Sequence, residues 1–134
     1  PAVERAMGEG IPVIAIDTAV DGTDVTSFVA TDNLTAARMQ GKWVAENIAD
    51  DGELILINGL VAQSTGRDRR DGFLEVMKEE KPNVEIYQVD TKWSQEEAQN
   101  GAEDLLQAHP NVSFIVCAWD GGSMGAIAAL KGMG

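Results

Sequence analysis

The feature that most constrains the fold is an alternation of short, β-branched apolar runs with longer amphipathic segments. Strand-like runs stand at 11–16, 53–58, 84–89 and 112–118, with a brief extended piece at 27–30. The first run, Ile-Pro-Val-Ile-Ala-Ile, has no polar position and is expected to be buried on both faces of a sheet. Strands joined through helices run parallel, because the helix returns the chain to the same end of the sheet. The sequence therefore predicts an α/β fold, an open and doubly wound parallel sheet with flanking helices.

Capping and stop signals place helices between these runs. Asp32 and Asn33 offer an N-cap for the first helix, and Ser-Gln-Glu-Glu at 94–97 has the capping-box pattern. The first helix carries an apolar stripe formed by Leu34, Ala37, Gly41, Val44, Ala45 and Ile48. Further helices are expected from about residue 67 to the Lys-Pro pair at 81–82, and from about residue 123 to residue 132.

Composition excludes several classes of partner. The 134 residues carry 10 Lys and Arg against 22 Asp and Glu, a formal net charge of −12. Such a surface repels phosphate, so we expect neither a nucleic-acid partner nor binding to an anionic membrane. The single cysteine, Cys117, cannot form an internal disulfide, and no motif indicates a metal or a cofactor. No apolar run is long enough to span a bilayer.

Polar and aromatic residues gather where the predicted strands end. In open α/β sheets the ligand lies at the carboxyl ends of the strands, where the loops begin. These loops carry Asp17 and Thr18, then Gln63 and Ser64 before an Arg-Asp-Arg-Arg segment at 67–70, then Asp90 to Trp93, and finally Trp119 with Asp120. A sugar stacks its C–H face on an aromatic ring, and its hydroxyls bond well to charged groups. This combination of residues is typical of a carbohydrate pocket.

Each of these residues also has a purely structural interpretation. Asp17 is of a type that often starts a turn, and Asp120 of a type that often caps a helix. Trp93 is compatible with packing beside the Ser94 cap. Arginines near a helix start oppose the helix dipole, which favours a ligand role for one of them over a solvated surface. Trp119 suits a pocket and an interface equally well.

Three residues that often carry chemistry are expected to be structural here. They are Trp43, which packs a helix, His109 at a helix end, and Cys117 in a buried strand. The segment Gly-Gly-Ser-Met-Gly at 121–125 matches the nucleophile elbow of serine hydrolases. In that fold the acid and the histidine follow the serine, whereas no histidine follows this segment. We therefore expect no enzymatic activity.

Several segments resemble the periplasmic sugar-binding proteins of ABC importers, of the ribose and galactose-binding type. They are GIPVIAIDT, FVATDN, the Arg-Asp-Arg-Arg-Asp-Gly-Phe stretch at 67–73, LLQAHPNV and the terminal AWDGGSMGAIAALKGMG. The resemblance covers nearly the whole chain, and its motifs are fairly specific in combination. It implies the type I periplasmic-binding-protein fold, in which two similar α/β lobes, joined by three crossing segments, close on one sugar.

The resemblance implies that the chain corresponds to a central part of such a protein. Residues 1–31 are expected to form the end of the first lobe and the first crossing, and residues 32–134 the first part of the second lobe. The opening residues read as the middle of a helix without a signal peptide, which also predicts a piece of a longer protein. This piece alone is expected to bind sugar weakly or not at all. It is also expected to self-associate through the apolar strand at 11–16.

The resemblance carries ligand-binding roles over to Asp17, Arg69, Trp93, Trp119 and Asp120. Asp17 would accept hydrogen bonds from sugar hydroxyls, and Arg69 would supply the cation of the second-lobe wall. Trp93 would supply the stacking ring. Trp119 departs from the family pattern, because many members have Asn at this position, whereas Asp120 keeps the acid that follows it.

The sequence thus predicts the solute-binding receptor of an ABC sugar importer. It would capture a monosaccharide reversibly in the cleft and deliver it to a membrane permease, in the periplasm or another extracytoplasmic space. Trp119 and Thr18, which replaces an arginine common in ribose binders, leave the identity of the sugar open. The alternative is the sugar-sensing core of a LacI-type transcription regulator. Such regulators usually carry a Gly-His pair where this chain has Asp-Asp-Gly-Glu at 50–53, and an acidic chain suits DNA poorly.

Overall fold

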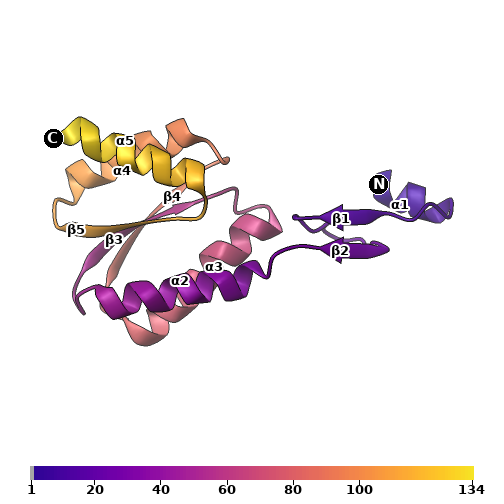
Figure 1. Ribbon diagram of the computed structural model, residues 1–134, viewed down its shortest axis with the longest axis horizontal. Coiled ribbons are helices and arrows are strands. Elements are labelled where there is room, and N and C mark those ends of the chain that lie inside the picture. The colour runs from indigo at the N-terminus through magenta and orange to yellow at the C-terminus, as the bar shows by residue number, and fades with distance from the viewer. Residues whose placement is uncertain (1) are drawn as a thin grey trace.

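A computed structural model describes residues 2–134 as two α/β parts placed end to end (Figure 1). The smaller part contains helix α1 (Ala2–Gly8) and strands β1 (Ile14–Ile16) and β2 (Ser27–Val29). The larger part contains α2 (Asn33–Asn47), β3 (Glu53–Asn58), α3 (Ser64–Glu80), β4 (Glu85–Asp90), α4 (Gln95–Ala108), β5 (Val112–Cys117) and α5 (Asp120–Met133). This order confirms the predicted alternation of strands and helices.

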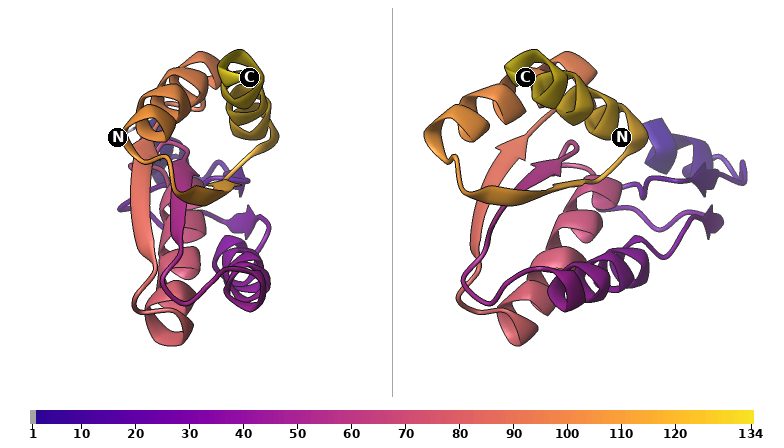
Figure 2. Two further views of the ribbon diagram at one scale, coloured as in Figure 1. Left: turned by 90° about the vertical axis from the view of Figure 1, so that its left-hand side faces the viewer. Right: turned by 60° about the vertical axis from the view of Figure 1, so that its left-hand side comes forward.

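The larger part is built on a parallel sheet with the strand order β4-β3-β5. After β3 the chain moves to one side to form β4, and it then passes back over β3 to form β5. Right-handed crossovers in opposite directions place their helices on opposite faces of a sheet. Accordingly, α2 and α3 cover one face, and α4 and α5 cover the other (Figure 1 and Figure 2). The doubly wound α/β fold is confirmed.

The central strand β3 shows how the apolar runs build this core. Successive side chains of a strand point to opposite faces. Leu54 and Leu56 therefore pack in the cluster between the sheet and helices α2 and α3, together with Phe73. Ile55 and Ile57 pack in the cluster against α4 and α5. All four β3 side chains are buried. A run without polar positions thus contributes apolar side chains to the core on each face of the sheet.

The smaller part does not bury its apolar strand in this way. β1 pairs in parallel with β2, and no third strand within residues 2–134 joins this sheet. Ala15 is buried, but Ile14 and Ile16 are 62% and 75% exposed. The expectation that this run is buried on both faces is therefore wrong for this chain, and the strand begins only at Ile14. The reason is that no described helix covers the face that carries Ile14 and Ile16, and α1, the helix of this part, buries none of its own residues.

Two helices begin three residues earlier than the sequence predicts. α3 starts at Ser64 and α5 at Asp120, after Gln63 and Trp119 at their N-cap positions. Neither N-cap residue makes a side-chain capping hydrogen bond, so the usual start signal is missing from the sequence. The predicted caps of α2 and α4 are confirmed, because Asp32 accepts from the Thr35 N–H and Ser94 from the Glu97 N–H. No helix within residues 2–134 is long and apolar enough to cross a membrane.

The loop that follows β1 connects the two parts beyond the covalent link. Thr18 Oγ1 lies 3.1 Å from Thr65 Oγ1, and the Ala19 N–H donates to Ser64 Oγ at 3.0 Å. Both partners belong to the first turn of α3, which follows the carboxyl end of β3. The carboxyl end of β1 is therefore held beside the end of the larger sheet at which its loops begin.

Candidate functional site

The predicted ligand residues meet around one pocket between the two parts of the molecule. This pocket has a volume of about 300 Å³ and is lined by Asp17, Gln63, Thr65, Arg69, Trp93 and Trp119. Asp17 comes from the smaller part, and the others follow strands β3, β4 and β5 of the larger part. The structure thus brings together four of the five predicted residues, at the position expected for a parallel sheet. Their role toward a ligand stays a prediction.

Trp93 occupies a strained and closely fitted position in this pocket. Its backbone φ is 62°, in the left-handed region, which a bulky side chain rarely adopts. Its indole Nε1–H donates to Gln63 Oε1 at 2.7 Å. A Cβ atom at Gly59 would lie 2.1 Å from Trp93 Cζ3, so only glycine at this position leaves room for the ring. The first residue after β3 thus determines where the aromatic ring after β4 can lie.

Arg69 is held by neutral acceptors. Its Nε donates to Asn33 Oδ1 and its Nη1 to the Ala118 carbonyl, both at 2.8 Å. The guanidinium carbon lies 5.9 Å from the centroid of the Trp93 ring, within the range of a cation–π contact. Within residues 2–134 no carboxylate forms an ion pair with Arg69. The guanidinium is therefore oriented by the fold, and no described carboxylate neutralises its charge.

Trp119 forms a second aromatic wall. Its ring meets that of Trp93 edge to face, with centroids 5.3 Å apart and an interplanar angle of 85°. A Cβ at Gly121 would lie 2.6 Å from Trp119 Nε1, and a Cβ at Gly122 would lie 2.9 Å from Trp119 Cζ3. The two glycines therefore let the ring fold back over the start of α5. Two indoles at right angles form an apolar corner of the kind that packs against C–H groups.

Asp17 shares an unusual backbone conformation with Trp93. Its φ is 70°, and within residues 2–134 only these two non-glycine residues have a positive φ. The carboxylate is exposed and accepts a hydrogen bond from the Thr18 hydroxyl at 3.1 Å. Strained backbone persists only where the surroundings hold it, and it gathers at ligand sites. Both strained residues line this pocket, which supports its choice as the candidate site.

Asp120 is the predicted residue that the structure does not bring into the pocket lining. It is exposed as the first residue of α5, and it does not cap that helix, because Trp119 occupies the N-cap. In the sequence, Gln63 stands out only as part of a polar loop, and Thr65 does not stand out at all. A helix start at Ser64 would have revealed both, because it places residues 63 and 65 at the carboxyl end of β3.

The residues that resemble a hydrolase triad lie apart. His109 precedes β5 and stacks on Tyr87, with centroids 3.6 Å apart, whereas Ser123 follows the other end of that strand. The Ser123 hydroxyl donates to the Trp119 carbonyl at 3.4 Å.

Burial raises the pKa of the Cys117 thiol, which disfavours a reactive thiolate. Among the described residues no group of His, Cys, Asp and Glu is arranged to hold a metal ion.

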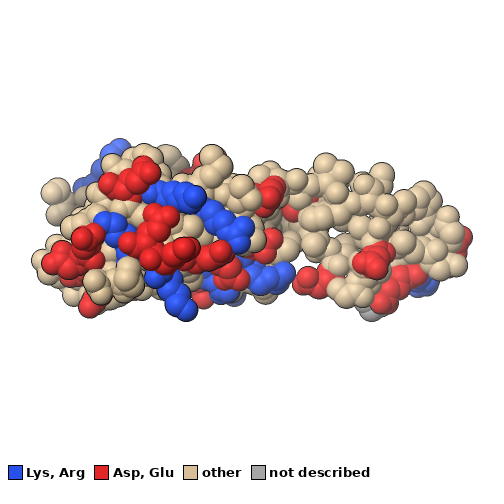
Figure 3. All heavy atoms as spheres, turned by 90° about the horizontal axis from the view of Figure 1, so that it is seen from below, with Lys and Arg blue, Asp and Glu red and all other residues tan. Residues whose placement is uncertain are grey.

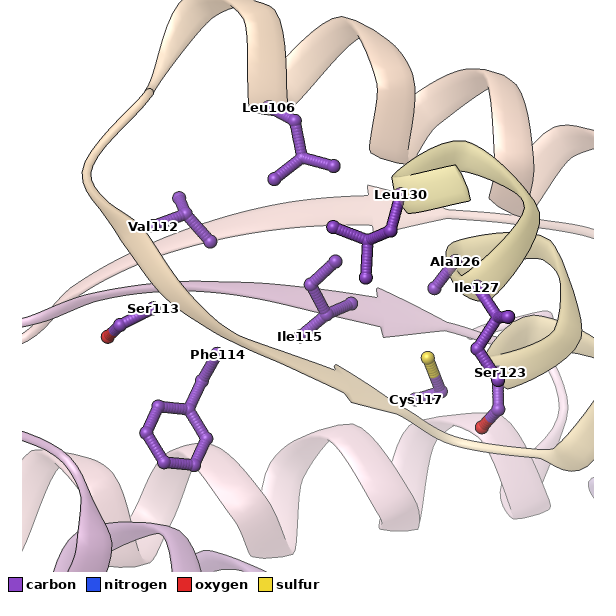
Figure 4. A pocket seen from close by; sticks show the side chains of 10 residues that line it. All are labelled: Leu106, Val112, Ser113, Phe114, Ile115, Cys117, Ser123, Ala126, Ile127 and Leu130. Atoms are coloured by element: carbon purple, nitrogen blue, oxygen red, sulfur yellow. The ribbon is translucent and has the colours of Figure 1, made fainter. Parts of the chain in front are cut away.

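A second pocket, of about 350 Å³, lies between β5 and α5 (Figure 4). It is lined by Leu106, Val112, Ser113, Phe114, Ile115, Cys117, Ser123, Ala126, Ile127 and Leu130, and the side chains of Ile115 and Leu130 point toward one another. None of these described lining residues carries a charge. A sugar bound there would leave most of its hydroxyls unpaired, at about 1–3 kcal/mol each. Its chemistry therefore does not fit a carbohydrate.

The charged side chains of the larger part are mixed rather than segregated. On the face that carries α2 and α3, acidic and basic groups alternate without a continuous basic patch (Figure 3). Arg38 pairs with Glu75, and Arg70 pairs with Asp71, both within 2.8 Å. A nucleic-acid surface needs unpaired cations gathered along one face. This face therefore offers no such surface.

Comparison with known proteins assigns this architecture. The family model of the periplasmic binding protein domain matches residues 1–134. The ribose import binding protein of Salmonella typhimurium is 30% identical over 133 residues, which cover 99% of this chain and 45% of that protein. The D-apiose import binding protein of Actinobacillus succinogenes is 29% identical and is covered over 43% of its length.

A solved structure extends the comparison to three dimensions. An ABC transporter periplasmic solute-binding protein from Actinobacillus succinogenes 130z, with bound D-allose, has a TM-score of 0.86 at 28% identity. The match covers 99% of this chain and 50% of that protein. This chain thus has the fold of part of a periplasmic sugar-binding protein, as the resemblance predicts, and it spans about half the length of the relatives that it matches.

Proposed function

The chain belongs to the periplasmic binding protein domain family, and on that premise we propose that the protein is the solute-binding receptor of an ABC sugar importer. It captures a monosaccharide without covalent chemistry, in the pocket between the two parts of the molecule, and delivers it to a membrane permease. The observation that carries this proposal is the shared lining of the pocket by Asp17 of the smaller part and Arg69, Trp93 and Trp119 of the larger part.

Each lining residue supports one aspect of sugar binding. The Trp93 ring stacks on the C–H face of the sugar, and Trp119 bounds the pocket at a right angle to it. Arg69 donates charge-assisted hydrogen bonds to ring hydroxyls, and Asp17 accepts them. Because Asp17 belongs to the other part of the molecule, a bound sugar bridges both parts. The ligand therefore stabilises their closed arrangement, which is the form that a permease recognises.

The compartment and the partner follow from the same proposal. A receptor that delivers sugar to an importer works outside the cytoplasmic membrane, so we place this protein in the periplasm or an equivalent space. The relatives named as import binding proteins favour this function over a transcription regulator with the same lobes. The net charge of −12 favours it too, since DNA association needs the opposite sign.

Titration calorimetry of the full-length protein tests the proposal. A panel of D-ribose, D-allose, D-apiose and D-fructose should contain a sugar that binds with a Kd of about 1 μM, near −8 kcal/mol. Trp93→Ala should weaken that affinity by about 30-fold or more, because it truncates a central aromatic contact. Trp43→Ala is the matched control, because Trp43 is exposed and packs against Phe114, away from the pocket. Absence of heat with every sugar, or an unchanged Kd in Trp93→Ala, contradicts the proposal.

A further inference from the structure

We propose that Gln63 is a positioning residue that locks the Trp93 indole into the orientation needed for stacking on a sugar. The inference deepens the proposed function and rests on it. The observation behind it is the hydrogen bond from Trp93 Nε1–H to Gln63 Oε1, at 2.7 Å, between two residues that line the same pocket. The two side chains come from different loops, after β3 and after β4.

The position of Gln63 in the chain would allow its side chain to cap a helix, but the side chain does not do so. Gln63 is the N-cap residue of α3, with extended backbone angles and no side-chain capping bond. Residues at this position commonly use a side-chain oxygen to accept from the free N–H groups of the first turn. Here the Gln63 oxygen points to the indole. The side chain at this helix start thus bonds to Trp93 and does not cap the helix.

Trp93 has few other directional contacts. Its backbone N–H donates to Thr91 Oγ1 at 3.3 Å, which anchors the main chain but leaves the ring free. The ring itself meets the Trp119 ring edge to face, lies near the guanidinium of Arg69 and packs closely on Gly59. None of these contacts is a hydrogen bond to the indole N–H. The bond to Gln63 therefore holds the Nε1 edge of the ring, because Nε1 is the one hydrogen-bond donor of an indole.

This lock has a consequence for recognition. An indole whose N–H is already bonded to the protein offers its face to a ligand and does not select a hydroxyl. Selection among sugars therefore falls to Asp17 and Arg69, while Trp93 contributes stacking. Without the Gln63 acceptor, the N–H loses its partner in a half-buried site, and the ring pays an orientational cost on binding.

The test uses three variants of the full-length protein. Gln63→Met removes the acceptor at similar length, and Gln63→Glu restores a side-chain oxygen. Gln107→Met makes the first change at an exposed glutamine of α4, outside the pocket. For each variant, calorimetry measures the Kd for the best sugar of the panel named above. Proton and nitrogen NMR of the indole N–H, assigned with Trp93→Phe, measures its exchange with water.

We expect Gln63→Met to weaken the Kd by about 3- to 10-fold and to speed indole exchange at least about fivefold, as for the loss of one hydrogen bond. Gln63→Glu should return both values to within about twofold of wild type, and Gln107→Met should change neither. Wild-type Kd or wild-type exchange in Gln63→Met overturns the inference. If the wild-type protein binds no sugar, the proposed function fails, and unchanged exchange in Gln63→Met then overturns the lock independently.

Discussion

The two sheets of this molecule contain closely similar apolar strands that differ in how far their side chains are buried. Ile16 in β1 is 75% exposed, whereas Ile57 in β3 is completely buried, although both lie at or next to the carboxyl end of a parallel strand. β3 has a neighbouring strand on each side and a helix layer on each face. Among the described residues, β1 has a single neighbouring strand, and no helix covers the face that carries Ile14 and Ile16.

The comparison separates two properties of an apolar run, its extended conformation and its burial. The run determines that the segment is extended, because β-branched residues favour strands. Burial depends on what the rest of the chain places on either face, and this chain supplies two pairs of helices to one sheet only. The pocket lies between these unequal parts. Its side that carries Asp17 follows β1, which belongs to the less covered sheet.

The matched pair Ile57→Ala and Ile16→Ala is the strongest way to break this comparison. Ile57→Ala should lower the free energy of unfolding of the 134-residue chain by about 2–5 kcal/mol, because it leaves a cavity in a packed core. Ile16→Ala should change it by about 0.5 kcal/mol or less, because its side chain is already in water. Urea unfolding followed by circular dichroism measures both. Equal losses would show that β1 is covered as well as β3 is.

Gly59→Ala tests the larger part where it meets the pocket. The new Cβ would overlap the Trp93 ring, so we expect a loss of about 1–3 kcal/mol in the free energy of unfolding. Gly132→Ala is the matched control, because a Cβ there meets no atom within 4 Å. The cost should fall sharply when Gly59→Ala is made in a Trp93→Ala background. A cost that is the same in both backgrounds would mean that the ring does not cause it.

The junction between the parts has a pH dependence of its own. Hydrogen bonds from the Thr35 N–H and hydroxyl lower the pKa of Asp32 below its ordinary value of 3.8. The ionised cap therefore stabilises the folded chain above that pH, and this contribution disappears as the pH falls through the lowered pKa.

Asp32→Ala should therefore melt at a lower temperature than wild type near pH 7, by less than Gly59→Ala does, and the difference should shrink as the pH falls below 3.8 and through the lowered pKa of Asp32. Thermal melts at several pH values measure it, with Asp51→Ala as an exposed control that caps no helix. A difference that stays constant over this pH range would count against the charged cap.

The smallest effect is expected in the association of chains through the uncovered β1–β2 sheet. Its exposed Ile14, Ile16 and Phe28 favour contact with a second copy, while the short strands and a net charge of −12 oppose it. Light scattering should show a mass that rises slowly with concentration. Ile14→Lys with Ile16→Lys should abolish the rise, whereas Ile127→Lys on α5 should not. A monodisperse wild-type monomer would refute this prediction.

Much of the fold was predictable because its signals are local. The run at 53–58 matches β3 residue for residue, and the caps at Asp32 and Ser94 lie where their side chains indicate. The starts of α3 and α5 were not predictable to the residue, because Gln63 and Trp119 carry no capping signal. Their side chains serve the pocket instead, where Gln63 bonds to the Trp93 indole and Trp119 packs against its ring.

By itself, the sequence determined the order of the elements, the parallel sheet, and the residues that follow each strand. These depend on periodicity and on neighbours in the chain. Only the tertiary structure decided that Ile14 and Ile16 stay exposed and that Asp120 lies outside the pocket lining. Likewise, only the fold could show that Asn33 accepts a hydrogen bond from Arg69 and that Gln63 accepts one from Trp93. The two hydrogen bonds join residues 36 and 30 positions apart, and no local pattern encodes which partners the packed layers bring together.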